Sequence, residues 1–178
     1  YNLISYHNFA HGVFVMQYFN YIINQIDSKK LNFSNEHIFI CLIACIGHDL
    51  GHPGTNNLFH INNSTKYACK SNFKSVLENY HASNLLKLLS KEKNDIFICY
   101  SKDEKIKIKN TIIECILSTD MSLHSNIVKE FDNLNIQNIN ENNLLISKLL
   151  VHSSDISNIL LPFNNYLEWS SLLIQEFS

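Results

Sequence analysis

The sequence predicts an all-α protein, and three observations support this fold class. Apolar residues recur at three- and four-residue spacing through most of the chain, which is the period of a helix packed against a core. Most isoleucines fall in groups with this helical period. No Asn-Gly or Asp-Gly pair, the strongest short signal of a β-hairpin, occurs in the sequence.

Five apolar groups mark the expected helices. In chain order they are Val13, Met16, Phe19 and Ile23; the run 38–46 (IFICLIACI); Leu85, Leu88 and Leu89; Ile112, Ile113, Ile116 and Leu117; and Leu145, Leu149 and Val151. The two prolines, Pro53 and Pro162, predict helix boundaries because a proline cannot donate a backbone hydrogen bond. Residues 132–143 (DNLNIQNINENN) contain few good helix formers and predict a solvated loop between helices.

Length and charge limit the number of domains and the class of partner. With 178 residues, of which 46% are hydrophobic, the chain can bury one sizeable core, and we expect one domain over 1–178. The formal net charge is -2, and the 14 basic residues are all lysines. A near-neutral chain without arginine is not typical of a nucleic-acid binder, so we expect no nucleic-acid partner.

Cysteine use and hydropathy bear on the cellular compartment. The five cysteines form no Cys-x-x-Cys pair, and most lie in apolar surroundings, which favours buried reduced thiols and a reducing compartment. The longest apolar run, 38–46, has nine residues, about half of the roughly 20 that a membrane-spanning helix needs. We therefore expect no membrane segment or signal peptide in this chain, and a location in the cytoplasm or, if a longer protein carries an anchor, on the cytoplasmic face of a membrane.

Three short segments bring histidine or aspartate to an apolar helix. His7 and His11 lie four positions apart in YHNFAH. His48 and Asp49 end the apolar helix 38–46, and His52 follows one helical turn later in HDLGHPGTNNLF. Asp155, in VHSSDISN, ends the last apolar group. Each segment taken alone is as readily a set of hydrogen-bonded core residues.

The combination of the three segments favours a metal site. Polar groups that apolar helices carry into a core need partners there, and a divalent cation would supply them. Imidazoles together with carboxylates suit a borderline cation such as zinc. Glu78 in SVLENYH and Thr119-Asp120 in STDMSLH are further polar groups on apolar helices, although a solvated face and a helix-end cap explain them equally well.

Taken in order, these segments resemble the catalytic signatures of the class I 3′,5′-cyclic nucleotide phosphodiesterases. The matching segments are YHNFAH, HDLGHPGTNNLF, SVLENYH, STDMSLH and HSSDISN, followed by EWSSLLIQEF, and they span residues 6–177. HDLGHPGTNNLF discriminates best among them. The resemblance implies the multi-helical HD-domain catalytic fold of that family and hydrolysis of cAMP, cGMP or both to 5′-monophosphates. It also implies two divalent cations, with zinc in the tighter site and magnesium or manganese in the second.

The resemblance also implies roles for individual residues. His11, His48, Asp49 and Asp155 match the ligands of the first cation, and Asp49 also reaches the second. His52, Thr119 and His81 match positions that bind metal waters or steady the site. His7 and Glu78 match catalytic positions, with His7 as the proton donor. The substrate pocket is matched by Tyr6, Met121, Ile156 and Asn158.

The implied chemistry explains why these residue types are needed. A water between two divalent cations loses its proton near neutral pH, and the resulting hydroxide can attack the cyclic phosphate while the cations neutralise phosphoryl charge. The leaving O3′ then needs a proton. Protonated His7, held by Glu78, can supply it, because histidine titrates close to physiological pH.

Some positions depart from the family pattern. Phe14 stands where the family usually has an acidic residue, Tyr80 replaces a usual histidine, and the run Asn158–Pro162 lacks the usual first proline. The chain also ends before the glutamine and phenylalanine with which the family recognises the base. We therefore expect a catalytic-domain fragment that lacks the C-terminal base-recognition part.

Two alternatives stay open. The metal ligands alone would serve equally in another HD-type phosphohydrolase acting on a different phosphate ester. A catalytically silent metal-binding module with a regulatory role is the second alternative. The sequence does not indicate the oligomeric state or the choice between adenine and guanine.

Overall fold

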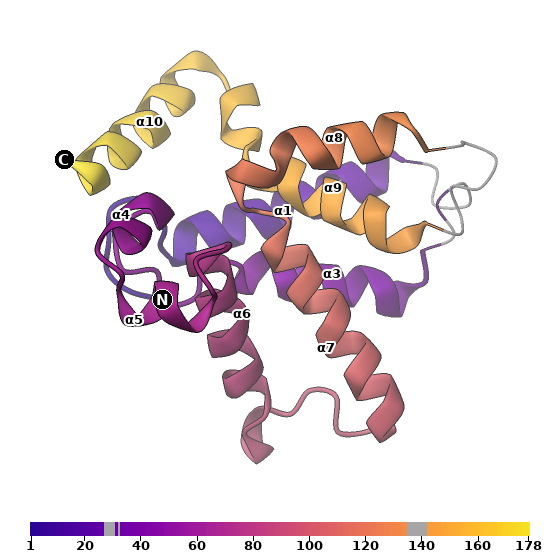
Figure 1. Ribbon diagram of the computed structural model, residues 1–178. Coiled ribbons are helices and arrows are strands. Elements are labelled where there is room, and N and C mark those ends of the chain that lie inside the picture. Colours follow the sequence, from indigo (N-terminus) through magenta and orange to yellow (C-terminus); the bar gives the residue numbers. More distant parts are fainter. Residues whose placement is uncertain (27–30, 32, 135–141) are drawn as a thin grey trace.

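The computed structural model describes residues 1–26, 31, 33–134 and 142–178, and all regular structure within these ranges is helical (Figure 1). The prediction of an all-α chain is confirmed for this part of the protein. The longer helices are α1 (Phe9–Gln25), α3 (Asn35–Gly47), α6 (Val76–Leu89), α7 (Lys102–Leu117), α8 (His124–Asp132), α9 (Asn143–Asp155) and α10 (Phe163–Phe177). The shorter ones are α4 (Asn57–Asn62), α5 (Lys66–Lys70) and the 3-10 turns η1 (Glu92–Asn94), η2 (Met121–Leu123) and η4 (Ser157–Leu160).

Local sequence sets where several helices begin. The Asn8 side chain accepts hydrogen bonds from the backbone N–H groups of Ala10 and His11 and so caps α1. Ser34 caps α3 in the same way, through His37 N–H. Ser101 and Glu104 form a reciprocal capping box at the start of α7. These caps fix the ends of the helices from which the core is built.

The core lies where α1, α3, α7 and α9 pack together. Each of the five predicted apolar groups lies in a helix, namely α1, α3, α6, α7 and α9. Buried side chains common to this core include Phe19, Cys45, Ile112, Ile116 and Val151. His48 and Asp49, which directly follow α3, are buried beside this core.

The end of α3 is held close to α6 by Gly47. A Cβ atom added to Gly47 would lie 2.5 Å from Leu85 Cδ2, a distance at which the side chain or the helix must shift. The absence of a side chain at Gly47 therefore lets α3 approach α6 directly before His48.

The helix boundaries predicted at the two prolines agree with the structure. Pro53 and Pro162 both lie outside the helices, and Pro162 directly precedes α10, as predicted. The predicted loop 132–143 joins α8 to α9, but its residues 135–141 lie outside the described part of the chain.

The prediction that most cysteines are buried agrees with the structure. Cys41, Cys45 and Cys115 are buried, whereas Cys69 and Cys99 are exposed, and all five thiols are free. Cys69 lies in the short helix α5 and Cys99 in the connection from α6 to α7, where little core covers them.

The last helix, α10, extends away from the bundle toward α4 (Figure 1). It contains no fully buried residue, and side chains such as Phe163 and Ile174 are mostly exposed. The Trp169 ring attaches it to the bundle by contacts with the rings of Tyr6 and Phe14, both at 5.5 Å between centroids. None of the described helices has the length and apolar character needed to cross a membrane.

Candidate metal centre and active site

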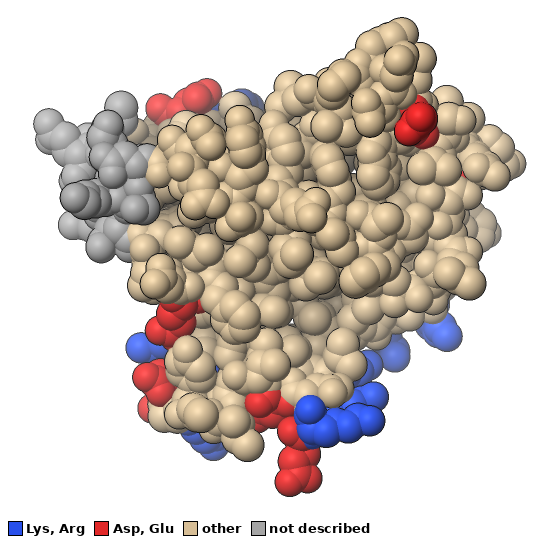
Figure 2. All heavy atoms as spheres, turned by 180° about the vertical axis from the view of Figure 1, so that it is seen from behind, with Lys and Arg blue, Asp and Glu red and all other residues tan. Residues whose placement is uncertain are grey.

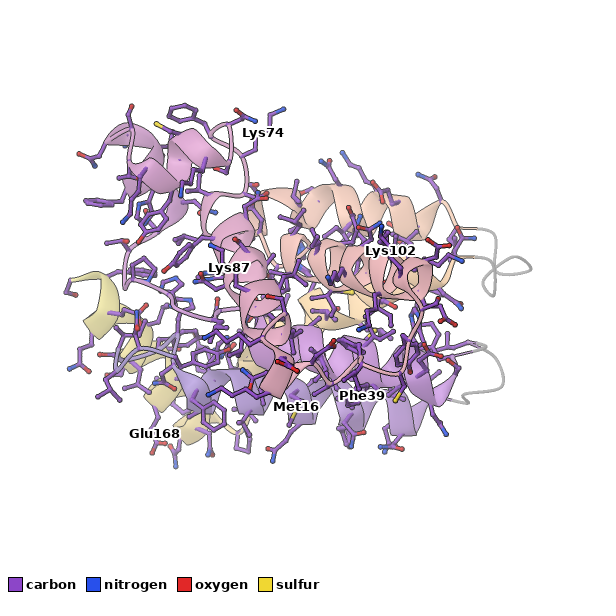
Figure 3. All side chains as sticks on the ribbon, turned by 90° about the horizontal axis from the view of Figure 1, so that it is seen from below. Met16, Phe39, Lys74, Lys87, Lys102 and Glu168 are labelled. Carbon is purple, nitrogen blue, oxygen red and sulfur yellow. The ribbon has the colours of Figure 1, made fainter. Side chains whose placement is uncertain are left out.

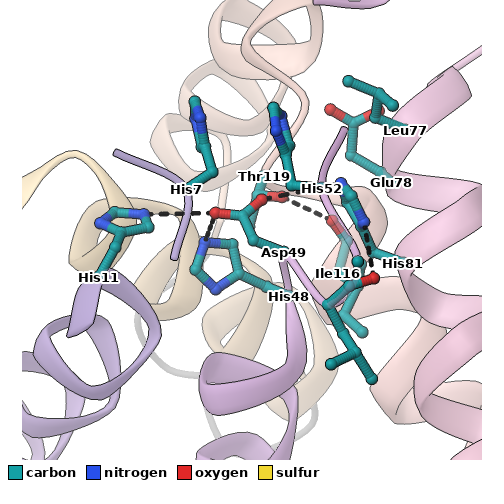
Figure 4. Close-up of polar contacts among 12 residues, drawn as sticks. His7, His11, His48, Asp49, His52, Leu77, Glu78, His81, Ile116 and Thr119 are labelled. Carbon is teal, nitrogen blue, oxygen red and sulfur yellow. Dashed lines mark hydrogen bonds and ion pairs between the residues drawn. The ribbon is translucent and has the colours of Figure 1, made fainter. Parts of the chain in front are cut away.

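The four predicted metal ligands meet at the point where three helices converge. His11 comes from α1, His48 and Asp49 from the end of α3, and Asp155 from the last position of α9. Figure 4 shows His11 and His48 directed toward the Asp49 carboxylate. The apolar faces of these helices carry the polar ends inward, so His11 and His48 are each only 1% exposed.

The ligand atoms lie close together. His11 Nε2 is 2.9 Å and His48 Nε2 is 3.1 Å from Asp155 Oδ1. The same two nitrogens lie 3.5 Å and 3.0 Å from Asp49 Oδ2. Two imidazoles and two carboxylates thus face one another across a small volume.

The hydrogen bonds around this cluster fit a divalent cation. His48 Nδ1 donates to the carbonyl oxygen of Cys45 at 2.7 Å, so the lone pair of Nε2 faces the two carboxylates. Asp49 Oδ2, His11 Nδ1 and His81 Nε2 are buried without a hydrogen-bond partner. Buried carboxylates and imidazoles left unpaired are costly, and a cation between them would remove much of that cost. The donor set of imidazole nitrogen and carboxylate oxygen is the one that zinc accepts.

The mutual influence of these groups is visible in their pKa values. Although burial opposes a charge on His48, the Asp49 and Asp155 carboxylates raise its pKa well above the usual value. Burial would raise the pKa of Asp49 and of Asp155, but His48 outweighs it and lowers both. The centre therefore holds both carboxylates in the ionised form that a cation requires.

A second cluster lies on the other side of Asp49. His81 Nε2 is 3.8 Å from Asp49 Oδ1, and the rings of His52 and His81 stack at 5.4 Å. Burial lowers the pKa of His52 to about 3 and that of His81 to about 4, so both rings are neutral at physiological pH. Asp49, His52 and His81 have ligand atoms close enough to surround one further cation.

His7 lies beside these clusters and is held by Glu176. His7 Nδ1 lies 2.6 Å from Glu176 Oε1, and Glu176 Oε2 accepts the backbone N–H groups of Tyr6 at 2.7 Å and His7 at 3.0 Å. Burial opposes protonation of His7, but the hydrogen bond to Glu176 raises its pKa overall. The ring also stacks on the neutral His52 ring at 4.0 Å. His7 is thus fixed through one ring nitrogen, which leaves Nε2 available to a bound molecule.

The expected contact between His7 and Glu78 is corrected by the structure. Both oxygens of Glu78 accept hydrogen bonds from Asn57 Nδ2, at 3.1 and 2.9 Å, while Glu176 takes the place beside His7. The physical reason is position: Glu78 belongs to α6, whereas α10 brings Glu176 to the segment before α1. Burial raises the pKa of Glu78 to about 7.

No pattern in the sequence predicted a role for Glu176. The signal available was an acidic residue inside the segment EWSSLLIQEF, and nothing in the local pattern links it to His7. The two residues are separated by 169 positions.

A cavity of about 320 Å³ opens onto the two clusters. Predicted site residues on its wall include His7, Asp49, His52, Glu78, His81, Thr119, Met121 and Asp155, and Leu58 and Phe177 also line it. The Thr119 hydroxyl donates to the Ile116 carbonyl at 2.8 Å, and the Asp120 carboxylate accepts from Ser75 Oγ and Ser122 N–H.

Three of the four predicted substrate contacts do not line this cavity. The Asn158 amide donates to the Tyr6 hydroxyl at 2.7 Å, and both side chains are buried. Ile156 follows α9 and is partly buried. Met121 does line the cavity and is 59% exposed. Substrate contact by Tyr6, Ile156 and Asn158 stays a prediction.

Comparison with known proteins gives consistent results. The family model for 3′5′-cyclic nucleotide phosphodiesterases matches residues 6–178. The chain is 35% identical over 99% of its length to a cGMP-specific 3′,5′-cyclic phosphodiesterase gamma of Plasmodium yoelii, and spans 23% of that protein. It is 36% identical over 99% of its length to the high affinity cGMP-specific 3′,5′-cyclic phosphodiesterase 9A of Drosophila melanogaster, and spans 12% of it.

A solved structure resembles the whole described fold. The phosphodiesterase domain of a rhodopsin fusion protein from Salpingoeca rosetta superimposes with a TM-score of 0.91 at 32% identity, covering 99% of this chain and 57% of that domain. The chain thus spans just over half of a solved phosphodiesterase domain and less than a quarter of the curated relatives named above. On the match to the family model and the convergence of its signature residues, the chain belongs to the 3′,5′-cyclic nucleotide phosphodiesterase family.

Proposed function

We propose that the protein hydrolyses 3′,5′-cyclic nucleotides, cAMP, cGMP or both, to nucleoside 5′-monophosphates. The observation that carries the proposal is the convergence of His11, His48, Asp49 and Asp155, of which the two carboxylates line a cavity that His7 also lines. Membership of the family supports the substrate class. The described residues supply the part of the domain that faces the phosphate.

Two divalent cations would complete the centre. His11, His48, Asp49 and Asp155 would hold the first, which we propose to be zinc. Asp49, assisted through water by His52, His81, Glu78 and Thr119, would hold the second, which we propose to be magnesium or manganese. When bound, these cations supply Lewis-acid polarisation of the phosphoryl oxygens and a more acidic water.

The protonated side chain of His7 serves as the general acid in this proposal. Hydrolysis forms a bond from a water oxygen to phosphorus and breaks the bond from phosphorus to O3′, so O3′ must gain a proton. His7 lines the cavity and can donate that proton from Nε2, while Glu176 fixes the ring through Nδ1 and stabilises the imidazolium.

The neighbouring side chains of the cavity assist this transfer. The neutral His52 ring, stacked on His7, limits its rotation without competing for the proton. Met121, Leu58 and Phe177 give the cavity an apolar side against which a ribose or base can pack.

An assay of the full-length protein tests the proposal. Hydrolysis of cAMP and cGMP is compared with hydrolysis of nucleoside triphosphates, with and without a chelator, for the wild type and for Asp155→Ala. We expect hydrolysis of at least one cyclic nucleotide, lost with the chelator and in the variant. Turnover of triphosphates alone would indicate the other HD-type activity, and bound metal without any turnover would indicate the silent module.

A further inference from the structure

A second surface feature lies along α6, away from the cavity that contains His7. Three hollows of about 340, 480 and 140 Å³ follow this helix. Lys87 lines both the first and the second hollow, and Lys109 lines both the second and the third. The three therefore form one elongated groove between α5, α6 and α7, which we call the lysine groove.

Positive charge dominates the lysine groove. Its lining includes five lysines, Lys66, Lys70, Lys87, Lys105 and Lys109. The acidic residue on the same lining is Asp95, which pairs with Lys105 at 2.8 Å. Within the described ranges, the other four lysines have no ion-pair partner. The net charge of -2 for the whole chain does not reveal this local excess. On the face drawn in Figure 2, lysine and acidic side chains lie together toward the lower part of the molecule.

The groove is separated from α10 and from the reactive face of α6. In Figure 3, Lys87 of α6, which lines the groove, lies apart from Glu168 of α10. On α6 itself, Glu78 and His81 line the active-site cavity, whereas Ser83 and Lys87 line the groove. The two surfaces thus use different sides of one helix.

The shape and lining of the groove favour a polypeptide over a nucleic acid. The half-buried Leu86, Leu89 and Ile113 provide apolar surface between the lysines, and Asn79, Ser83 and Ser90 provide hydrogen-bonding groups. An extended polypeptide could place acidic side chains against the lysines and apolar side chains against the apolar surface, while its backbone bonds to the polar groups. The two tyrosines on the lining, Tyr67 and Tyr80, pack against each other at 4.5 Å, so they offer no free platform on which bases could stack.

We propose that the lysine groove binds an extended acidic segment of a partner protein, in which apolar residues alternate with glutamate or aspartate. The charge complementarity would steer the partner to this face, and the apolar lining would hold it there. The proposal does not depend on the hydrolytic activity proposed above.

Binding of a defined probe to the full-length protein tests the groove. The probe is a fluorescein-labelled peptide of repeated Glu-Ser-Leu-Glu units, measured by fluorescence anisotropy at several salt concentrations. The groove variant is Lys66→Glu with Lys87→Glu. The matched control is Lys102→Glu with Lys129→Glu, which makes the same change in net charge at exposed positions that do not line the groove. Thermal unfolding of each variant verifies that it is folded.

We expect the groove variant to bind the peptide about tenfold more weakly or worse, and the control to bind within about twofold of the wild type. Equal loss in both variants would overturn the groove as the site, because net charge alone would explain it. Failure of the wild type to bind the peptide would overturn the proposal. The same holds if the wild type prefers a single-stranded oligonucleotide or phosphatidylserine vesicles to the peptide.

Discussion

Glu176 Oε1 lies 2.6 Å from Nδ1 of His7, and the same carboxylate accepts the backbone N–H group of His7. One acidic side chain from the end of α10 thus fixes both the ring and the backbone of the proposed acid. This relationship makes the protonation of His7 depend on a residue far away in the sequence.

Replacing Glu176 should shift the pH dependence of hydrolysis. The negative charge and hydrogen bond of Glu176 favour protonated His7, so Glu176→Gln lowers the pKa of His7. A general acid works in its protonated form, and activity is lost as the pH rises through its pKa. The alkaline limb of kcat/KM should therefore move to lower pH by about one pH unit or more. Glu168→Gln, an exposed acid on the same helix, is the control and should leave the profile in place.

Removing the imidazole of His7 should reduce turnover without removing the metal. We expect His7→Ala to lower kcat by about a hundredfold or more, which is the usual range for loss of a general acid. By elemental analysis, His7→Ala should contain as much metal as the wild type, because His7 is not one of the four residues proposed to hold the first cation. Unchanged turnover would transfer the acid role to another group, with His52 as the next candidate.

Loss of the cations should weaken the fold as well as the activity. Asp49 and Asp155 lie close to the same two imidazole nitrogens, and removal of a cation leaves these buried carboxylates balanced mainly by protonation of His48 in place of a divalent charge. A chelator should lower the Tm by about 5–10 °C, because a cation present at about 100 times its Kd stabilises the folded state by about 2.7 kcal/mol and the chelator removes this contribution. Asp155→Ala should lose bound metal, whereas Asp132→Asn at the exposed end of α8 should retain it. A carefully purified, active protein without metal would contradict this assignment.

A side chain at Gly47 should separate α3 from α6. The added Cβ of Gly47→Ala would lie 2.5 Å from Leu85 Cδ2, and such overpacking costs about 1–3 kcal/mol of the free energy of unfolding. Because His48 follows directly, metal affinity should fall as well. Urea denaturation of Gly47→Ala, Leu85→Ala and the double variant measures the coupling. The double variant should be more stable than the sum of the two single effects predicts, and strict additivity would contradict direct contact.

The sequence predicted those parts of the fold that follow a strong local period. The apolar groups of α1, α3, α7 and α9 each form one face of a long helix, and burial of these faces brings the helix ends together. For that reason His48, Asp49 and Asp155, which lie at helix ends, could be expected in the interior. The short helices α4 and α5, of six and five residues, are too short to show such a period.

Contacts set by tertiary packing could not be predicted in the same way. From the sequence, Glu78 was the expected partner of His7. The position of an acidic residue in the first turn of a helix does not indicate which side of the site that residue faces. The choice between Glu78 and Glu176 depends on where α10 docks, and the contacts of Trp169 with Tyr6 and Phe14 determine that. The hydrogen bond from Asn158 to Tyr6 depends on the same arrangement.

The order of the site residues along the chain has a consequence for biosynthesis. His11, His48, Asp49 and Asp155 all precede Glu176 in the sequence. A ribosome adds about 5–20 residues per second, so a nascent chain holds its complete set of cation ligands about a second or more before the partner of His7 has been made. The proposed cation ligands are therefore all synthesised before the carboxylate that pairs with His7. A cell short of the metal would make chains in which Glu176 and His7 meet beside an empty centre.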